Sequence, residues 1–237
     1  MKLSGLQKLT LLDFPGKTAA TIFTPGCNFR CPFCHNSDLV LGENLEGNAA
    51  FPEMLLEEFF AFLDKRHGLL DGICITGGEP LLQNDIEGFC RRIKTEGFAV
   101  KLDTNGSFPE KLRDLVDAGL VDYVAMDVKN CPSRYGETIG LPPFDSTPVQ
   151  ASIDYLLRGT IPYEFRTTVV RELHDTESLI ALAHRIAGAD AWYLQSFLDS
   201  ETVLAGQGAL HPYTAEELQA LLPTLKTIID HTRLRGV

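Results

Sequence analysis

The chain has 237 residues, of which 44% are hydrophobic and 22% are charged, a composition typical of a water-soluble globular protein. Its 21 basic and 32 acidic residues give a net charge of −11, which argues against electrostatic binding of nucleic acid. No apolar run approaches the roughly 18 residues of a membrane span. The N-terminus lacks the apolar stretch of a secretory signal. We therefore expect a cytoplasmic protein with neither a nucleic-acid nor a membrane partner.

The first predicted element is a hairpin-like stretch from Leu9 to Lys17, with a turn at Phe14-Pro15-Gly16. After it, strand-like and helix-like segments alternate along the chain. Six apolar, β-branched runs have the length of strands: Thr18–Thr24, Gly72–Thr76, Val100–Asp103, Tyr123–Asp127, Tyr163–Val170 and Trp192–Phe197. The amphipathic segments between them are Pro52–Arg66, Asn84–Gly97, Pro109–Gly119, Pro148–Gly159 and Thr176–Gly188.

A last helix is predicted over residues 214–230, because Thr214-Ala215-Glu216-Glu217 has the pattern of a capping box. Alternating strands and helices indicate a parallel sheet covered by helices. Six such units are too few for a closed eight-strand barrel, so we expect an α/β fold with a partial, open (β/α)6 barrel. We expect one domain over residues 1–237, with residues 1–17 as an N-terminal extension. The Pro- and Gly-rich segment Cys131–Thr147 is predicted to be a long loop, and long loops are often functional.

Three cysteines, Cys27, Cys31 and Cys34, follow the first predicted strand with the spacing C-x3-C-x2-C. An iron–sulfur cluster is normally held by four thiolates, so a site with three leaves one iron open for chemistry. Two different interpretations remain open at this point. His35 could complete a structural Cys3His zinc site, although the paired knuckles usual for zinc are missing from the sequence. The three thiols could also be inert.

The remaining cysteines and most of the histidines have ordinary structural explanations. Cys74, Cys90 and Cys131 lie in or beside apolar segments and are expected to be small core residues of a protein in a reducing compartment. Four histidines in polar or helical surroundings are expected to be exposed: His67, His174, His184 and His231.

Polar residues gather where the predicted strands end, which is where parallel β/α folds place reactive groups. Each also has a structural interpretation. The segments that begin at Gly77 and Asp103 could be turns, and Asp127 with Lys129 could be a surface ion pair. Arg166 could be solvated, and Gln195 could be hydrogen-bonded in the core. Strand periodicity does place Asp127 and Lys129 on the same side of their strand. In strand order, these groups are Gly77-Gly78-Glu79-Pro80, Asp103-Thr104-Asn105-Gly106, Asp127 with Lys129, Arg166, and Gln195.

Taken together, these motifs resemble the radical S-adenosylmethionine (radical SAM) enzymes and, more narrowly, the activating enzymes of glycyl-radical enzymes. The run from Gly5 to Lys17, which leads into Phe23-Thr24-Pro25-Gly26-Cys27, is similar to anaerobic ribonucleoside-triphosphate reductase activating proteins. The resemblance extends from Gly5 to about Phe197. It implies that the open barrel is a radical SAM barrel.

The resemblance also implies a role for each matching residue. Cys27, Cys31 and Cys34 would ligate a 4Fe-4S cluster, whose fourth iron binds the amino and carboxylate groups of S-adenosylmethionine. The further implied cofactor contacts are Phe33 at the adenine, Gly77, Gly78 and Glu79 at the methionine amino group, Asp103 and Asn105 at the ribose, and Asp127, Lys129 and Arg166 at the carboxylate end. Gln195 is an additional candidate for cofactor contact, and the resemblance suggests a monovalent cation at Asp103, Thr104 and Asp127.

The implied activity is reductive cleavage of S-adenosylmethionine to a 5′-deoxyadenosyl radical, which removes hydrogen from a glycine of a partner protein. The expected partner is anaerobic ribonucleotide reductase, with an electron donor such as flavodoxin. A pyruvate formate-lyase activase would use the same chemistry, but the histidine motif of that activator is not found in Leu194-Gln195-Ser196-Phe197. A small-molecule enzyme resembling 7-carboxy-7-deazaguanine synthase and a non-enzymatic zinc-binding protein are also compatible with the sequence.

Overall fold

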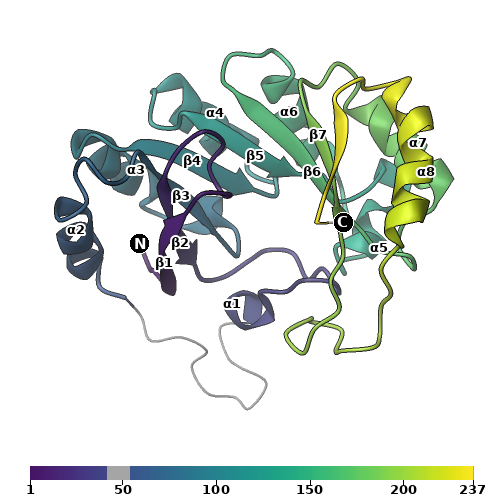
Figure 1. Cartoon of the computed structure of the whole chain (residues 1–237), viewed down its shortest axis with the longest axis horizontal. Helices are drawn as coiled ribbons and strands as arrows, with labels where there is room; N and C mark the ends of the chain where they lie inside the picture. The colour runs from purple at the N-terminus through teal and green to yellow at the C-terminus, as the bar shows by residue number, and fades with distance from the viewer. Residues whose placement is uncertain (42–53, 237) are drawn as a thin grey trace. The chain divides into compact units, whose positions relative to one another are not determined.

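The structure is a computed structural model that describes residues 1–41 and 54–236 (Figure 1). The chain divides into two compact units. The first comprises Met1–Asn28, Asp38–Thr104 and Glu110–Val124, and the second comprises Phe29–Ser37, Asn105–Pro109 and Ala125–Val237. That residues 1–237 act as one domain stays a prediction.

The described residues contain eight strands in a mostly parallel sheet whose strand order follows the sequence, so the sheet is open, with β1 and β8 at its edges. Strand β1 pairs antiparallel with β2, whereas β2, β3 and β4 are parallel, as are β6, β7 and β8. All six predicted strands are confirmed. The bounds are β1 Gly5–Thr10, β2 Ala19–Thr24, β3 Gly72–Gly77, β4 Ala99–Thr104, β5 Tyr123–Asp127, β6 Tyr163–Val169, β7 Trp192–Ser196 and β8 Thr232–Arg235.

Every predicted helix has a counterpart in the structure, although the predicted helix start at Pro52 lies outside the described residues. The α-helices are α1 Ser37–Leu41, α2 Leu56–Asp64, α3 Ile86–Thr95, α4 Pro109–Asp117, α5 Tyr135–Thr138, α6 Thr147–Leu156, α7 Thr176–Arg185 and α8 Ala215–Lys226. Two 3-10 turns, η1 Pro80–Leu82 and η2 Pro132–Arg134, complete the set. The turn η2 and helix α5 lie within the segment predicted as a long loop.

The core of the first unit is built on β2 and β3, whose residues are largely buried, as expected for strands covered on both faces. Helix α3 contributes Ile86, Phe89, Cys90 and Ile93, a spacing of three and four residues that puts all four on one helical face. The helix packs against β4 (Figure 1). Gly97, which follows the end of α3, has a left-handed φ of +85°, the conformation that favours glycine after a helix.

The second unit buries Trp192 of β7 completely, and its indole N–H donates to the hydroxyl of Thr167 on β6 at 3.0 Å. Helix α8 packs against β8 and α7. The predicted capping box is confirmed, because the Glu217 N–H donates to the Thr214 hydroxyl and the Thr214 N–H donates back to the Glu217 carboxylate at 2.8 Å. The sequence pattern therefore located the start of α8 correctly.

Two expectations were wrong, and one strand was not predicted. The hairpin arms are β1 and β2, so the stretch from Leu9 to Lys17 is mainly their connection rather than the hairpin itself. Strand β8 was not predicted, because its four residues, Thr232–Arg235, are mostly polar. His174 was expected to be exposed but is 1% exposed, because its ring bonds to backbone groups on two segments.

Candidate active site

The segment that opens the cysteine loop is fixed by backbone hydrogen bonds within the first unit. The N–H of Gly78 donates to the Thr24 carbonyl at 2.9 Å, and the N–H of Glu79 donates to the Gly26 carbonyl at 2.8 Å. The N–H of Gly26 in turn donates to the Leu39 carbonyl at 2.8 Å. The residue immediately before Cys27 is therefore bonded both to the glycine motif and to helix α1.

The two glycines of this motif are required by close backbone packing. A Cβ on Gly77 would lie 2.4 Å from the Thr24 nitrogen, and Gly77 also has a φ of +119°. A Cβ on Gly78 would lie 1.9 Å from the Gly26 carbonyl oxygen and 3.3 Å from the Cys27 nitrogen. The interpretation of the motif as an independent turn is therefore incomplete, because these glycines bring the end of β3 against the start of the cysteine loop.

Glu79 is fully buried within the first unit. One of its carboxylate oxygens accepts hydrogen bonds from the Leu81 N–H at 3.0 Å and from the Thr104 hydroxyl at 2.8 Å. The side chain thus caps the 3-10 turn η1 and links the end of β3 to the end of β4.

Asp103 is part of a buried ion pair that sequence reasoning missed. Lys101, two residues earlier on β4, is 1% exposed, and its ammonium contacts the Asp103 carboxylate. It also lies 3.8 Å from the sulfur of Cys74, its register partner on β3. A buried lysine was not expected, but the period-two spacing to Asp103 was a visible signal for the pair.

In the second unit, the rest of the cysteine loop is held by backbone bonds to two later segments. The Arg30 N–H donates to the Ile139 carbonyl at 2.9 Å, and the Leu204 N–H donates to the Cys34 carbonyl at 3.0 Å. Cys31 and Phe33 are 7% and 4% exposed, so the loop turns both side chains inward.

Asp127, Lys129 and Arg166 form one ion-pair cluster, with Asp127 and Lys129 at the end of β5 and Arg166 in the middle of β6. The Lys129 ammonium lies 3.1 Å from one oxygen of Asp127, and the Arg166 Nε lies 2.8 Å from the other. Burial alone would raise the pKa of Asp127, but the charges of Arg166 and Lys129 outweigh it and hold that pKa well below its usual range. Burial would lower the pKa of Lys129, whereas Asp127 keeps it above its ordinary value. Arg166 is therefore not the solvated edge residue that was one interpretation.

Lys129 connects this cluster to the cysteine loop. Its ammonium lies 5.8 Å from the centre of the Phe33 ring. Burial raises the pKa of the Cys34 thiol, while a bond from the Asn36 N–H and the positive charge of Lys129 act to lower it. The structure thus brings together, within one unit, two of the predicted cluster ligands, the predicted adenine contact and the predicted basic residues.

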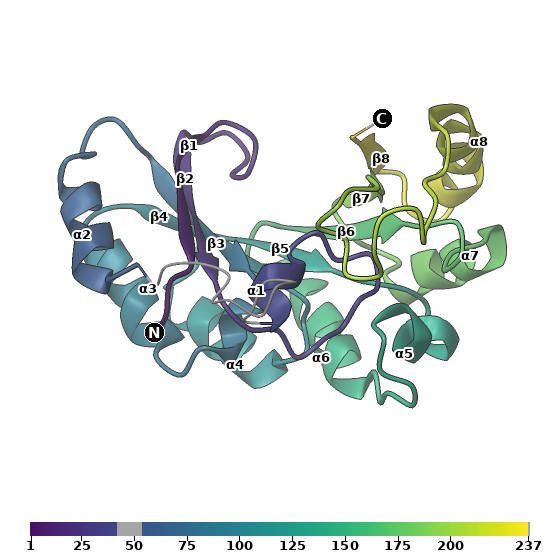
Figure 2. The same ribbon diagram turned by 90° about the horizontal axis from the view of Figure 1, so that it is seen from below.

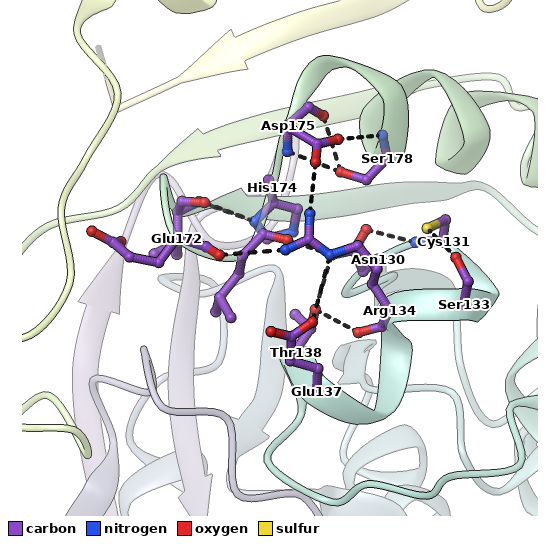
Figure 3. Close-up of polar contacts among 12 residues, drawn as sticks. Asn130, Cys131, Ser133, Arg134, Glu137, Thr138, Glu172, His174, Asp175 and Ser178 are labelled. Atoms are coloured by element: carbon purple, nitrogen blue, oxygen red, sulfur yellow. Dashed lines mark hydrogen bonds and ion pairs between the residues drawn. The ribbon is translucent and has the colours of Figure 1, made fainter.

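Buried hydrogen bonds of Asn130 and His174 fix the segment that follows Lys129 in the chain (Figure 3). Asn130 is fully buried, and its amide donates to the Thr138 hydroxyl at 2.9 Å and to the Leu173 carbonyl at 2.8 Å. One ring nitrogen of His174 accepts from the Val170 N–H at 3.1 Å, and the other donates to the Lys129 carbonyl at 2.8 Å. This pattern requires neutral imidazole, and burial correspondingly lowers the pKa of His174.

The remaining candidates are Asn105 and Gln195, with His35 as the alternative zinc ligand. Asn105 is buried, and its side chain accepts from the N–H and the hydroxyl of Ser107, which closes a local turn. Gln195 is half-buried on β7, opposite Thr168 and Arg235 in register. His35 is exposed and contacts the Ser200 hydroxyl.

Comparison with known proteins identifies the class of this site. The family model described as the radical SAM superfamily matches residues 21–183, more than half of the chain. The chain belongs to the radical SAM superfamily. The matched segment contains all three cysteines and the candidate site residues from Gly77 to Arg166.

The relatives of this radical SAM protein include enzymes that act on other proteins. It is 34% identical, over 99% of its length and 95% of the relative's, to a protein of Methanocaldococcus jannaschii described as a glycyl-radical enzyme activating enzyme. It is 30% identical to the pyruvate formate-lyase 1-activating enzyme of Escherichia coli over 54% of this chain and 52% of that one. Among solved structures, Streptococcus suis SuiB bound to S-adenosylmethionine shares the fold, with a TM-score of 0.66, 14% identity, and coverage of 91% of this chain and 52% of that one.

Membership of the radical SAM superfamily makes the chain an enzyme whose cofactors are a 4Fe-4S cluster and S-adenosylmethionine. The cysteines suit the 4Fe-4S cluster by their chemistry, since none of the three is in a disulfide and thiolates on one loop are the usual ligands of iron–sulfur centres. Cys27 belongs to the first unit and Cys31 and Cys34 to the second. Among the described residues, no three His, Cys, Asp or Glu side chains are already gathered as a metal site.

Cys74, Cys90 and Cys131 are buried, as expected of core residues, and burial raises the pKa of the Cys90 thiol to about 12. None of the helices in residues 1–41 and 54–236 combines the length and hydropathy needed to cross a membrane.

Proposed function

We propose that this radical SAM enzyme activates a glycyl-radical enzyme by removing a hydrogen atom from a backbone glycine, and that its partner is anaerobic ribonucleotide reductase. The observation that carries the proposal is the ion-pair cluster of Asp127, Lys129 and Arg166 set against the cysteine loop in one unit. The relationship to the activating enzyme of Methanocaldococcus jannaschii over nearly the whole chain supports the reaction class.

In this proposal Cys27, Cys31 and Cys34 hold the 4Fe-4S cluster. When bound, the cluster and S-adenosylmethionine together supply the 5′-deoxyadenosyl radical, with one electron from a donor such as flavodoxin. The bonds that the Gly78 and Glu79 N–H groups donate position the start of the loop. The bond from the Arg30 N–H to the Ile139 carbonyl and the bond from the Leu204 N–H to the Cys34 carbonyl position the rest of it.

The cluster of Asp127, Lys129 and Arg166 suits the carboxylate of the bound amino acid. Asp127 contributes one negative charge and the two basic residues contribute two positive charges, so the cluster has a formal charge of +1. A carboxylate neutralises that charge, and both an ammonium and a guanidinium can donate to its oxygens. Asp127 holds the two cations in place, because its low pKa keeps it ionised.

The amino end of the methionine needs acceptors for the N–H groups of its amine. We assign this role to the Gly77-Gly78-Glu79 segment, where glycine allows a ligand to approach the backbone closely. Asp103 and Asn105 at the end of β4 are proposed to face the ribose, with Lys101 and Ser107 fixing their side chains. Phe33 is proposed to lie against the adenine, and Gln195 is a further proposed cofactor contact.

The experiment that tests the function uses electron paramagnetic resonance. Anaerobically reconstituted protein is mixed with dithionite, S-adenosylmethionine and either the anaerobic ribonucleotide reductase or the pyruvate formate-lyase of the same organism. We expect a glycyl doublet with the reductase alone. A doublet with pyruvate formate-lyase alone would transfer the assignment to that partner, and 5′-deoxyadenosine formation without any doublet would favour a small-molecule substrate.

A further inference from the structure

Leu9 near the end of β1, together with Leu11 and Leu12 in the connection to β2, forms an exposed apolar tip on the first unit. Leu9, Leu11 and Leu12 are 57%, 71% and 88% exposed. Figure 2 shows this connection as a purple loop that extends beyond the ends of β1 and β2. Single exposed leucines are ordinary, but three within four residues make a patch of the kind that marks interaction sites.

The connection that carries the tip has a defined shape. The hydroxyl of Thr10 accepts the N–H groups of Leu12 and Asp13, each at 3.2 Å. The Asp13 carboxylate accepts the Thr21 hydroxyl at 2.6 Å, which ties the loop to β2. The leucines are therefore presented on a folded turn, which lowers the entropy cost of binding them.

The base of the connection is anchored in the core. Phe14 is 2% exposed, and its ring centre lies 6.1 Å from that of Tyr123. The next turn has Pro15 in its second position and Gly16, with a φ of +71°, in its third, and the Lys17 N–H closes it on the Phe14 carbonyl at 3.1 Å. These are the features of a type II turn. The apolar side chain that could be buried here, Phe14, is buried, while the three leucines face outward.

The charge of the connection differs from that of the chain. Residues 5–18 carry Lys8, Lys17 and Asp13, a net charge of +1, in a protein whose net charge is −11. A matching surface is an apolar pocket with an acidic rim. A two-fold contact between copies with the tip on the symmetry axis would instead bring like charges together.

The tip is also distant from the cysteine loop. Strand β2 lies between the tip and Cys27 along the chain, and its six residues span about 20 Å. An electron donor must approach the cysteines, whereas a large substrate protein has only to deliver one loop to them and can make contact elsewhere as well.

We propose that Leu9, Leu11 and Leu12 form the docking tip for the glycyl-radical enzyme partner, inserting into an apolar pocket with an acidic rim. This inference rests on the proposed function, because that function supplies the partner. It assigns substrate-protein recognition to the N-terminal hairpin and leaves S-adenosylmethionine cleavage to the strand ends and the cysteine loop.

The test compares Leu11→Ser/Leu12→Ser with Leu69→Ser, a control at a leucine that is 64% exposed between α2 and β3. The probe is the anaerobic ribonucleotide reductase of the same organism, with binding measured anaerobically by sedimentation. We expect the double variant to bind at least tenfold more weakly and to form the glycyl radical more slowly. Its partner-free formation of 5′-deoxyadenosine and its thermal unfolding should match the wild type, and the control should behave as wild type throughout.

Equal binding of the reductase by the wild type and the double variant would overturn the docking tip while leaving the proposed function intact. A wild type that neither binds the reductase nor installs a radical in it would overturn both. A wild-type self-association that is lost in the double variant, with reductase binding unchanged, would assign the tip to a second copy of the chain and also overturn the proposal.

Discussion

Replacement of Gly78 by alanine should both destabilise the first unit and impair cluster binding. The new Cβ would lie 1.9 Å from the Gly26 carbonyl oxygen, whereas real Cβ atoms essentially never approach closer than 3.0 Å. The two backbones must therefore separate by at least 1.1 Å, the difference between those distances. The atoms in contact are backbone atoms, so rotation of a side chain cannot relieve the clash.

The cost has two contributions. Overpacking of this kind costs about 1–3 kcal/mol. The separation also weakens the bonds that Gly78 and Glu79 donate to the Thr24 and Gly26 carbonyls, each worth about 0.5–1.5 kcal/mol. We expect a loss of about 3 kcal/mol in the free energy of unfolding, which lowers the urea midpoint by about 1 M for an m-value near 3 kcal/mol/M.

The matched control is Gly5→Ala on β1. A Cβ at Gly5 would meet only the Phe23 side chain, at 3.6 Å, an ordinary contact, so this variant should unfold as the wild type does. Urea unfolding gives the stability of both variants, and iron and sulfide content after anaerobic reconstitution gives cluster binding. A Gly78→Ala protein with an unchanged urea midpoint and full iron content would refute the reasoning.

Three further outcomes are expected. Cys34→Ala should lose most of its iron and the broad absorption near 400 nm on reconstitution, whereas Cys90→Ala should retain both, because Cys90 is a core residue; equal loss in both would contradict the assigned ligands. Asp127 has a folded pKa well below its unfolded value of about 3.9, so its contribution to stability is present above that value and is lost as the pH falls through the folded pKa. Asp127→Asn should therefore be less stable than the wild type at pH 6 but converge with it toward pH 2 in urea titrations, and a constant difference would count against this linkage. His174 has a lowered pKa, so the unfolded chain binds a proton first and wild-type stability should fall as the pH drops below about 6.5. His174→Gln should remove that slope between pH 7 and 5, and a retained slope would show that another group titrates.

The strands and helix ends were predictable because the residue patterns that produce them are local in the sequence. Glycines placed after predicted helices, such as Gly119 and Gly188, do have left-handed φ values of +67° and +92°. The capping box at Thr214 marked a helix start for the same reason, since both bonds join residues three apart. Strand β8 has four residues and few apolar ones, so its place depends on pairing with β7, which no local pattern indicates.

The candidate site was predictable only in part. Period two placed Asp127 and Lys129 together, and the structure confirms their contact. Local patterns do not show long-range partners, so Arg166 was placed on its strand without its pairing to Asp127. The burial of Lys101 was not predicted, and His174 was wrongly expected to be exposed. The reason is the same for both: a charged or polar residue is assigned to the surface unless its buried partners are known.

The cofactor-binding role proposed for Gly77-Gly78-Glu79 and the structural role of this motif are compatible with each other. A ligand-binding backbone must be held rigidly to bind a small cofactor, and the groups that hold it here are the same residues. Glu79 uses one oxygen to fix both η1 and Thr104, and its N–H fixes the carbonyl before Cys27. A substitution such as Glu79→Gln would therefore disturb the cysteine loop and the end of β4 together. Loss of activity in that variant would not by itself show contact with S-adenosylmethionine, whereas loss of activity with iron content and urea midpoint unchanged would.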